Sequence, residues 1–385
     1  MKNLACYITD YHEHFLERKR RDALMTVSNI QNNSAKLTAS VVGGGMGGRL
    51  SLVALAASDL FNLMAVADLR EDVRHQLSID FPGIRTFDSH QAMFAELPTD
   101  VVCVSTYAPS HEEITASALE LPLKGILVEK PLGHTAASGR RLVDAVKARK
   151  LPMAVPHGML AKRTPMEIIE RTQAGEIGDL RLVEIECAGW DIINAGIHWL
   201  DFCVTLTNCN PIDSVMALCD TSTRTYRDGM QVETEAVTFV QTHGGVRFVM
   251  HTGDHVRISR PGHDFLFRLI GTAGQIEFWG WENGYILQNA KHPGGEIITP
   301  IEYPITGHRR HLERMASMIG ADMPDYTIAD ASLMALEICE AAYLSSKHRC
   351  RIDFPFGDIT PPTDSVWDPG QPYSGSGGGR DGRNL

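Results

Sequence analysis

The glycines at positions 43 to 48 form the segment whose residue types point most clearly to ligand binding. Gly43, Gly45 and Gly48 have the spacing G-x-G-x-x-G, directly after an apolar run and directly before a sequence typical of a helix. In this spacing the first glycine permits a tight turn, the second lets the backbone approach a pyrophosphate, and the third lets a helix pack closely on a strand. Met46 and Gly47 would then lie at a helix N-terminus whose unpaired N–H groups face the phosphates. The segment predicts a dinucleotide site.

Asp68 is the residue predicted to select the dinucleotide. It lies twenty residues beyond Gly48, at the end of the next apolar run. A carboxylate at this place can accept hydrogen bonds from both hydroxyls of the adenine ribose, and it would repel a 2′-phosphate. Arg70, two residues later, could neutralise part of that repulsion. The pattern favours NAD, with NADP as the less favoured cofactor.

Two further segments follow the glycines, and with them they resemble a known family. Residues 102–111 read Val-Cys-Val-Ser-Thr-Tyr-Ala-Pro-Ser-His, and residues 125–132 read Gly-Ile-Leu-Val-Glu-Lys-Pro-Leu. Their order and spacing resemble the glucose-fructose oxidoreductase, inositol dehydrogenase and MocA (Gfo/Idh/MocA) family, whose most specific signature is a short strand ending in Glu-Lys-Pro. Residues 194–201, Asn-Ala-Gly-Ile-His-Trp-Leu-Asp, resemble that family's D-x-G-x-H-x-x-D motif, and residues 271–276 resemble a hairpin of its sheet. The resemblance extends over about residues 37–355.

The resemblance implies a fold, a reaction and an assembly. The fold is an α/β Rossmann domain followed by an α+β domain with a mainly antiparallel open-faced sheet, which often builds the interface of a homodimer or homotetramer. The reaction is reversible hydride transfer between nicotinamide and a secondary hydroxyl of a sugar, sugar derivative or cyclitol. The motifs also add side chains to the predicted cofactor site: Ser105, Thr106, His111, Glu129 and Lys130.

Three residues of these motifs supply the groups that alcohol oxidation needs. The reaction requires a base for the hydroxyl proton and a group that stabilises the developing alkoxide charge. His198 is the candidate base, because an unperturbed imidazole titrates near neutrality. Lys130 would place a cation near the reacting oxygen. Asn194 stands where many relatives have aspartate, and because an amide cannot take a proton, any relay through that carboxylate is absent.

Asn194 can still hydrogen-bond a substrate hydroxyl. If a helix starts after Ile193, Asn194 would cap it and share a face with His198. Some relatives that act on nucleotide-linked sugars carry asparagine here, which suggests a sugar 3-hydroxyl as the reacting group. Asp201, one turn beyond His198, either orients the imidazole or is a solvated helix residue.

Other polar residues near these motifs are candidates for substrate contact or for surface positions. His157 follows an apolar strand end, and Lys162 or Arg163 could bind a carboxylate or hydroxyl. Trp190 and Asp191 precede the His198 motif closely enough to line a pocket. His12 with His14, and His308 with His311, have spacings that metal sites sometimes use, but no nearby pattern completes either set, so no metal is predicted.

The elements that must position these residues follow from hydrophobic periodicity. Apolar runs alternating with helical stretches such as 49–57 predict a parallel sheet with right-handed crossovers; they are 37–42, 63–67, 101–105 and 125–128. Later runs alternate like half-solvated strands and predict the antiparallel sheet: 180–186, 236–242, 246–251, 265–270, 275–278 and 285–288. Helical patterns lie at 166–173 and 334–345.

These elements divide the chain into four predicted parts. Residues 1–34 form an N-terminal extension, 35–155 the NAD-binding domain and 156–356 the substrate and oligomerisation domain. Residues 357–385 form a Gly- and Pro-rich tail, which is either disordered or draped over another surface.

Length, charge and cysteine pattern limit the class of protein. The 385 residues suit two or three domains, and the net charge of −11 argues against a general affinity for nucleic acids or anionic membranes. None of the eight cysteines forms a C-x-x-C pair, no apolar run spans a bilayer, and the first fifteen residues lack a secretory pattern. We expect a cytoplasmic enzyme.

Two alternatives to a simple dehydrogenase remain open. In the first, transient oxidation at one carbon drives elimination, so that a glycoside is cleaved and NAD is regenerated. In the second, the chain is a non-catalytic regulator that senses dinucleotide, a class that the family includes.

Overall fold

The computed structural model describes residues 35–222, 225–356 and 369–372. Predictions on residues 1–34, and on the tail apart from 369–372, lie outside the described residues. The described residues from Leu37 onward belong to one compact unit.

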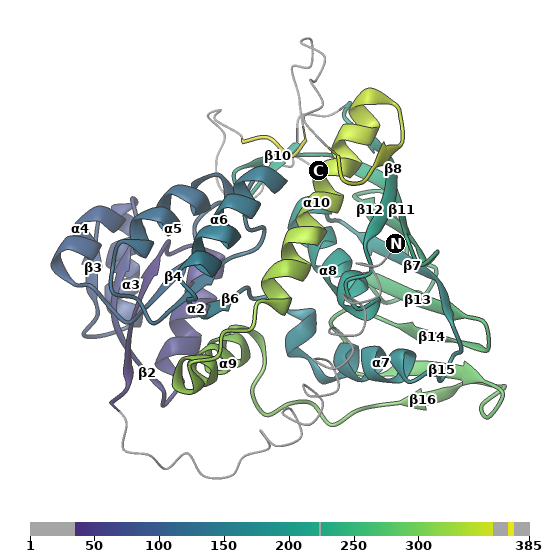
Figure 1. The fold of residues 1–385 in the computed structure, drawn as a ribbon, viewed down its shortest axis with the longest axis horizontal. Helices are drawn as coiled ribbons and strands as arrows, with labels where there is room; N and C mark the ends of the chain where they lie inside the picture. The colour runs from purple at the N-terminus through teal and green to yellow at the C-terminus, as the bar shows by residue number, and fades with distance from the viewer. Residues whose placement is uncertain (1–34, 223–224, 357–368, 373–385) are drawn as a thin grey trace, which may run out of the picture. The chain divides into compact units, whose positions relative to one another are not determined.

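The first half of this unit is a six-stranded parallel sheet with the strand order β3-β2-β1-β4-β5-β6 (Figure 1). All four residues of the central strands β4 and β5 are buried, as expected for a parallel sheet covered on both faces. This arrangement confirms the predicted Rossmann domain. The strands are β1 (Leu37–Val42), β2 (Phe61–Ala67), β3 (Arg85–Phe87), β4 (Val101–Val104), β5 (Gly125–Val128) and β6 (Met153–Ala154).

The helices that connect these strands cover the sheet, and one late helix returns to it. Figure 1 shows α9 (Gly307–Ala321) beside α2, although the two helices lie far apart in the chain. Leu312 and Met315 of α9 are fully buried among residues of β1 and α2. The connecting helices are α2 (Met46–Ala56), α3 (Glu71–Asp80), α4 (His90–Glu96), η1 (Ala108–Ser110), α5 (His111–Leu119) and α6 (Ala136–Ala148).

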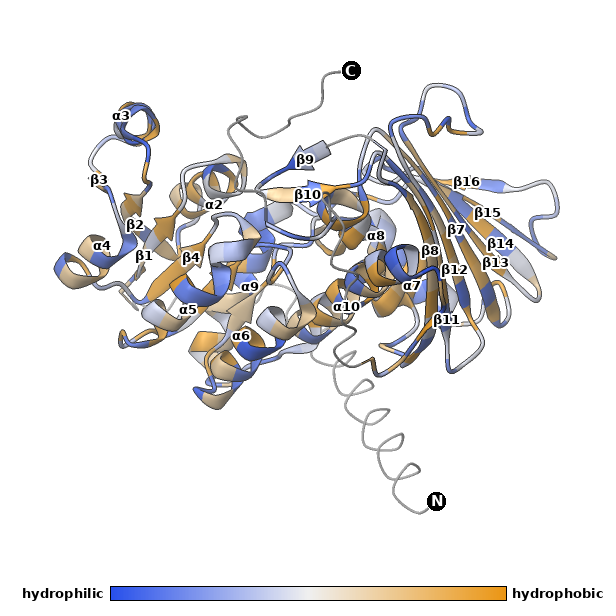
Figure 2. Cartoon of the chain, turned by 90° about the horizontal axis from the view of Figure 1, so that it is seen from above, coloured by the Kyte–Doolittle hydropathy of each residue, from blue (hydrophilic) through white to orange (hydrophobic). Residues whose placement is uncertain are grey.

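The second half is a nine-stranded sheet with the order β16-β15-β14-β13-β7-β12-β11-β8-β17. Only the β7–β12 pair is parallel, so the predicted mainly antiparallel sheet is confirmed. Hydrophobic and hydrophilic bands alternate along its strands in Figure 2. The strands are β7 (Leu180–Ala188), β8 (Ile212–Asp220), β11 (Glu235–Thr242), β12 (Arg247–Gly253), β13 (Phe265–Gly271), β14 (Gly274–Phe278), β15 (Tyr285–Asn289), β16 (Glu296–Ile298) and β17 (Ile352–Asp353).

Helices lie on one face of this sheet, and α10 joins the two halves. Figure 2 shows α7, α8 and α10 on the same side of the strands. The helix α10 (Thr327–His348) packs on β8 and also on α6 of the first half. The remaining elements are η2 (Met159–Ala161), α7 (Arg163–Gln173), η3 (Ile192–Gly196), α8 (Ile197–Leu206) and a small hairpin of β9 (Thr225–Arg227) and β10 (Met230–Val232).

Two of the expected helices begin earlier in the structure than the sequence predicted. The helix expected at 49–57 begins at Met46, because Gly45 is extended and α2 starts inside the glycine segment. The helix expected at 166–173 begins at Arg163, since Pro165 falls in its first turn, where a missing N–H is tolerated. Within the described ranges, no helix has the length and apolar character to cross a membrane.

Candidate active site

Two glycines of the turn after β1 have no room for a side chain. Gly43 has a φ of +97°, and a Cβ atom there would lie 2.5 Å from the Ser105 carbonyl oxygen. A Cβ atom on Gly48 would lie 1.8 Å from the Gly43 carbonyl oxygen, so α2 packs directly on the turn. A Cβ atom on Gly45, in contrast, would meet no atom within 4 Å. Because this open space lies at the N-terminus of α2, the turn fits a dinucleotide pyrophosphate.

Asp68 ties the end of β2 to this turn. Its Oδ2 accepts a hydrogen bond from the Gly44 N–H at 2.7 Å, and its Oδ1 accepts one from the Arg70 N–H at 2.8 Å. The side chain of Arg70 is exposed and pairs with Asp72 at 2.5 Å. The positive charge of Arg70 is therefore offset by Asp72, and Asp68 remains an acidic group at the predicted ribose position.

The loop after β4 lies beside the glycine turn, and the buried ring of His111 contacts this loop. The Ser105 N–H donates to the Val42 carbonyl at 2.8 Å. His111 is fully buried, with Nδ1 2.9 Å from the Pro131 carbonyl oxygen and Nε2 2.9 Å from that of Thr106. Since both ring nitrogens contact the protein backbone, we correct the predicted cofactor contact of this imidazole: it joins the loop to the Glu-Lys-Pro segment.

Glu129 is buried against the glycine turn. Its Oε1 lies 2.5 Å from His308 Nε2, and its Oε2 accepts the Lys130 N–H at 3.1 Å. A Cβ atom on Gly47 would lie 2.8 Å from the same Oε1. Burial raises the pKa of Glu129, but the hydrogen bond from His308 and nearby positive charge outweigh it, and the net shift is downward. Glu129 thus places an ionised group beside the turn.

His308 is a site residue that sequence reasoning missed. It lies on α9, 179 residues after Glu129, so no local pattern connects the two side chains. His311, one turn later, is buried and its Nε2 bonds the His157 carbonyl at 3.0 Å. The sequence did contain one signal for them: His308 and His311 are three residues apart in an amphipathic helix, and this spacing places both side chains on one helix face.

Lys130 and Asn194 are brought together from the two halves. The Lys130 Nζ donates to the Asn194 carbonyl at 2.7 Å. The Asn194 side chain is held in turn by Asp191, whose Oδ1 accepts its Nδ2 at 2.9 Å and its backbone N–H at 2.8 Å. Because a carboxylate only accepts, the amide nitrogen must face Asp191, and the amide oxygen is left for a ligand.

Asp191 belongs to a buried network and does not line a pocket. Its side chain is fully buried, caps η3 in place of the predicted cap Asn194, and pairs with Arg227 at 3.2 Å. Arg227 also lies over the Trp190 ring, 4.2 Å from the centroid. The predicted substrate contact of Asp191 is therefore corrected, because its buried side chain supports the segment that carries Asn194. Trp190 is partly buried, and its predicted substrate contact stays a prediction.

A second buried carboxyl, Glu233, completes this network. Its Oε1 accepts the Ile192 N–H at 2.7 Å and its Oε2 accepts the Tyr343 hydroxyl at 2.9 Å. Burial, followed by the charge of Asp191, raises the pKa of Glu233 above its ordinary value. Two buried carboxyl groups, those of Asp191 and Glu233, thus influence each other, and Asp191 is the one that pairs with Arg227.

His198 lies partly exposed at the start of α8, beside a second histidine. Its Nδ1 is 3.2 Å from His157 Nδ1, and its ring meets the Trp281 ring edge-on at 5.4 Å between centroids. Burial, followed by the charge of Lys130, holds the pKa of His198 well below its ordinary value. The residue is therefore neutral at neutral pH, as a base must be.

His157 and Asp201 lie behind His198 and are fully buried. Asp201 is thus not a solvated helix residue, and its Oδ2 lies 3.7 Å from His157 Nδ1. His157 Nε2 lies 2.8 Å from the Ser332 hydroxyl of α10. The predicted substrate contact of His157 is corrected, because both of its nitrogens face protein groups.

Lys162 and Arg163 have different surroundings. The Lys162 Nζ donates to the Trp281 carbonyl at 2.5 Å, which keeps it near the ring that contacts His198. Arg163 pairs with Glu167 at 3.1 Å along its own helix. Of the two, the structure brings only Lys162 toward the His198 cluster.

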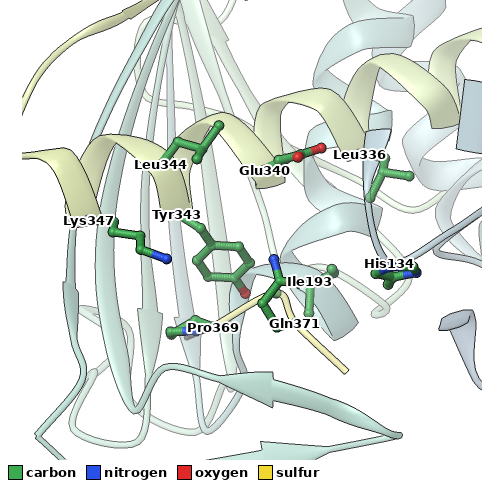
Figure 3. A pocket seen from close by; sticks show the side chains of 10 residues that line it. His134, Ile193, Leu336, Glu340, Tyr343, Leu344, Lys347, Pro369 and Gln371 are labelled. Atoms are coloured by element: carbon green, nitrogen blue, oxygen red, sulfur yellow. The ribbon is translucent and has the colours of Figure 1, made fainter. Parts of the chain in front are cut away.

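Two other features of the described residues bear on ligands. No group of three His, Cys, Asp or Glu side chains within 35–222, 225–356 and 369–372 is placed to hold a metal ion. A cavity of about 50 Å³, large enough for water molecules only, has Tyr343 and Ile193 facing the segment with Pro369 and Gln371 (Figure 3). Its full lining is His134, Ile193, Leu336, Glu340, Tyr343, Leu344, Lys347, Pro369, Gly370 and Gln371.

Comparison with protein families identifies the first half. Residues 37–157 match the model of the Gfo/Idh/MocA oxidoreductase family with NAD-binding Rossmann fold. This match covers the predicted nucleotide-binding domain and bears out the resemblance seen in its sequence motifs. The matched family consists of NAD-binding oxidoreductases, which is the cofactor and the reaction class that the resemblance implied.

Two relatives are similar over most of their length. The rhizopine catabolism protein MocA of Rhizobium meliloti is 25% identical over 323 residues, which are 78% of this chain and 92% of the relative. The D-glucoside 3-dehydrogenase of Escherichia coli is 24% identical over 328 residues, which are 76% of this chain and 90% of the relative. Sugar dehydrogenases are therefore among the proteins that this chain resembles.

A solved structure shares the whole fold. GenD2 from gentamicin A biosynthesis, in complex with NAD, aligns with a TM-score of 0.70 and 21% identity, covering 86% of this chain and 99% of GenD2. This likeness supports the two-part architecture.

Proposed function

We propose that the chain is an NAD-dependent dehydrogenase that transfers a hydride between nicotinamide and a secondary hydroxyl or keto group of a sugar, sugar derivative or cyclitol. One observation carries the proposal: Lys130 of the nucleotide half donates to the backbone of Asn194 in the other half, and its charge acts on His198. A cation, a neutral imidazole and an amide acceptor meet there, next to a dinucleotide turn.

Each of these groups has a role in alcohol oxidation. His198 takes the hydroxyl proton through Nε2, because its Nδ1 faces His157. Lys130 stabilises the negative charge that develops on the oxygen. The Asn194 amide oxygen accepts a hydrogen bond from a neighbouring substrate hydroxyl, and Lys162 is placed to contact a more distant one.

Bound NAD supplies the hydride acceptor. The residues that fit it are the glycine turn 43–48, Asp68, and the loops with Ser105, Thr106 and Glu129. Asp68 would bind the adenine ribose and disfavour a 2′-phosphate, so NAD is preferred over NADP. Arg70, paired with Asp72, offers that phosphate little compensation.

The substrate proposed is a hexose derivative with a free 3-hydroxyl. Asparagine at position 194 suggested this group, and the similarity to a D-glucoside 3-dehydrogenase adds support. A test is a screen of glycosides, free sugars and cyclitols with NAD, following the absorbance of reduced nicotinamide.

The decisive variant is Lys130→Met. We expect kcat/KM to fall by about 1000-fold, because the charge that stabilises the alkoxide is lost, with the Kd for NAD unchanged within severalfold. The matched control is Lys124→Met, which removes an exposed lysine paired with Asp100 and leaves turnover intact. Wild-type rates in Lys130→Met would contradict the proposal.

The same screen separates the two other functions. Glycoside cleavage without net formation of reduced cofactor would favour transient oxidation and elimination. Binding of NAD without turnover of any compound would favour a regulator. No structural observation specifically supports either glycoside cleavage or a regulatory role.

We further propose a cytoplasmic homodimer or homotetramer. Met216, Leu218 and Val237 are neighbours on β8 and β11, and their exposed fractions are 51%, 74% and 45%. A second copy of this chain packing on that face would bury them. Light scattering of the full chain measures the assembly.

A further inference from the structure

We propose that His157 is a positioning residue that accepts the Nδ1 proton of His198 when His198 takes up the substrate proton at Nε2, so that proton removal from the substrate involves two imidazoles. The inference rests on the proposed function of Lys130 and His198, and it assigns His157 and Ser332 a part in the same site.

His157 is placed for this role by burial and by its two partners. Its side chain is fully buried, and its ring stands at 86° to the His198 ring with 5.2 Å between centroids. The two Nδ1 atoms are 3.2 Å apart, and the other nitrogen, Nε2, is 2.8 Å from the Ser332 hydroxyl. His157 is therefore shielded from solvent, and its Nδ1 faces His198.

The short contact between two Nδ1 atoms fixes where protons can be. Two imidazole nitrogens at hydrogen-bond distance must share one proton, with one ring as donor and the other as acceptor. When His198 donates its Nδ1–H, its Nε2 carries the lone pair that a base needs. His157 then accepts at Nδ1 and donates its Nε2–H to Ser332, whose hydroxyl can accept.

This arrangement defines the proton step. The substrate O–H bond breaks as its proton joins His198 Nε2, and the His198 Nδ1 proton passes to His157 Nδ1. The electron pair of the O–H bond forms the second bond of the carbonyl as the hydride leaves the carbon for nicotinamide. His198 ends neutral, and His157 holds the additional proton on a ring with two N–H groups.

The charged and titratable groups around the pair come from three elements. Lys130 follows β5, His308 and His311 lie on α9, and Asp201 lies on α8. Burial and the charges of Lys130 and His311 lower the pKa of His157, so this ring is neutral before the reaction. His308 in turn pairs with the carboxylate of Glu129.

Asp201 is the acidic group that faces His157. Its Oδ2 is 3.7 Å from His157 Nδ1, and neither carboxyl oxygen has a hydrogen-bond partner among the described residues. Burial raises the pKa of Asp201 well above its ordinary value. A positive charge on His157 favours ionisation of Asp201, and a negative charge on Asp201 favours protonation of His157. The two groups therefore titrate as a pair.

The main test compares His157→Gln with wild type in the full chain with NAD and a turned-over sugar. Glutamine can hydrogen-bond His198 but cannot hold a proton, so we expect kcat to fall by about 100-fold with the Kd for NAD unchanged. In mixtures of light and heavy water, with hydride transfer limiting the rate, wild type should show two protons in transfer. His157→Gln should show one, which a merely structural role would not produce.

Ser332→Ala is the milder variant that leaves both histidines in place. It should lower kcat severalfold and retain the two-proton response. If His157→Gln keeps kcat within twofold of wild type, or if wild type transfers a single proton, the proposal is overturned.

A measurement that needs no substrate separates this proposal from the proposed function. Nitrogen NMR of histidine-labelled protein should show His198 protonated at Nδ1 and His157 at Nε2 near neutral pH. Protonation of His198 at Nε2 alone overturns the inference even in an active enzyme. The expected pattern without any sugar turnover supports the imidazole pair and rejects the dehydrogenase.

Discussion

The nucleotide half and the substrate half of the candidate site are positioned by different means. Around the glycine turn the backbone sets the geometry: Gly48 lies against Gly43, and the neighbouring strand ends supply Asp68 and Ser105. Around Asn194 the geometry depends on buried side chains that are distant in sequence: Arg227 of β9, Glu233 just after β10 and Tyr343 of α10.

This difference has an energetic consequence. A backbone turn loses its geometry when a methyl group is added at a tightly packed glycine, because the two chain segments can no longer approach each other. A buried polar network fails when one charge is removed, because its partner remains in a low-dielectric environment. Perturbing each half in its own way tests whether the two are independent.

The largest effect is expected at the glycine turn. Gly48→Ala would place its Cβ 1.8 Å from the Gly43 carbonyl oxygen, so α2 and the turn must separate. We expect the free energy of unfolding to fall by about 3 kcal/mol, with loss of NAD binding. Denaturant unfolding and calorimetric titration with NAD measure the two effects.

Gly45→Ala is the matched control for this prediction. Its methyl group would meet no protein atom within 4 Å, so the unfolding free energy should stay close to that of wild type. The methyl group would occupy the place predicted for the pyrophosphate, and NAD affinity should fall at least tenfold. Equal NAD affinity in Gly45→Ala and wild type would show that the pyrophosphate does not bind at this turn.

A smaller effect is expected in the substrate half from Asp191→Asn. The amide keeps an oxygen for the Asn194 N–H but removes the charge that pairs with buried Arg227. We expect a loss of about 2 kcal/mol of unfolding free energy, and a raised KM because Asn194 loses its orientation, with NAD affinity unchanged. Thermal unfolding and steady-state kinetics measure these changes.

The surface variant Asp179→Asn serves as its control. Asp179 is 78% exposed and pairs with Arg181, and pairs of this kind contribute little. If Asp191→Asn weakens NAD binding as much as it raises KM, the two halves are coupled and the comparison fails.

The contrast also explains what the sequence could predict. Gly43, Gly45, Gly48 and Asp68 occur at fixed short spacings along alternating strands and helices, so motif and periodicity were enough to locate them. Lys130 and His198 were found through their motifs. The two sheets followed from the apolar patterns, although the sequence did not predict β3, β8, β9, β10, β16, β17 or α9.

The supporting residues could not be found in the same way. His308 reaches Glu129 from a helix 179 residues away, and Ser332 reaches His157 across 175 residues. Such contacts depend on how α9 and α10 pack, and no local spacing encodes that packing. For the same reason Asp191 and His157 were expected to face a substrate, whereas tertiary packing buries them.

The smallest expected effect is a pH-dependent change in the free energy of unfolding, and it concerns Glu233. Its raised pKa means that the folded chain retains a proton there, which an unfolded chain with an ordinary carboxyl has already released. Between those two pKa values the folded state binds more protons, so its stability falls as the pH rises. Burial is the main cause of this raised pKa, and the charge of Asp191 adds to it.

Glu233→Gln should flatten that dependence. The glutamine can accept the Ile192 N–H and hydrogen-bond Tyr343 without holding a titratable proton. From about pH 5 to about pH 8, the variant should gain about 1 kcal/mol of unfolding free energy relative to wild type. Exposed Glu120→Gln provides the control, and urea unfolding at several pH values measures both. If Glu233→Gln parallels wild type at every pH, Glu233 is ionised in the fold, and the substrate half tolerates two interacting buried negative charges, of which Asp191 alone pairs with Arg227.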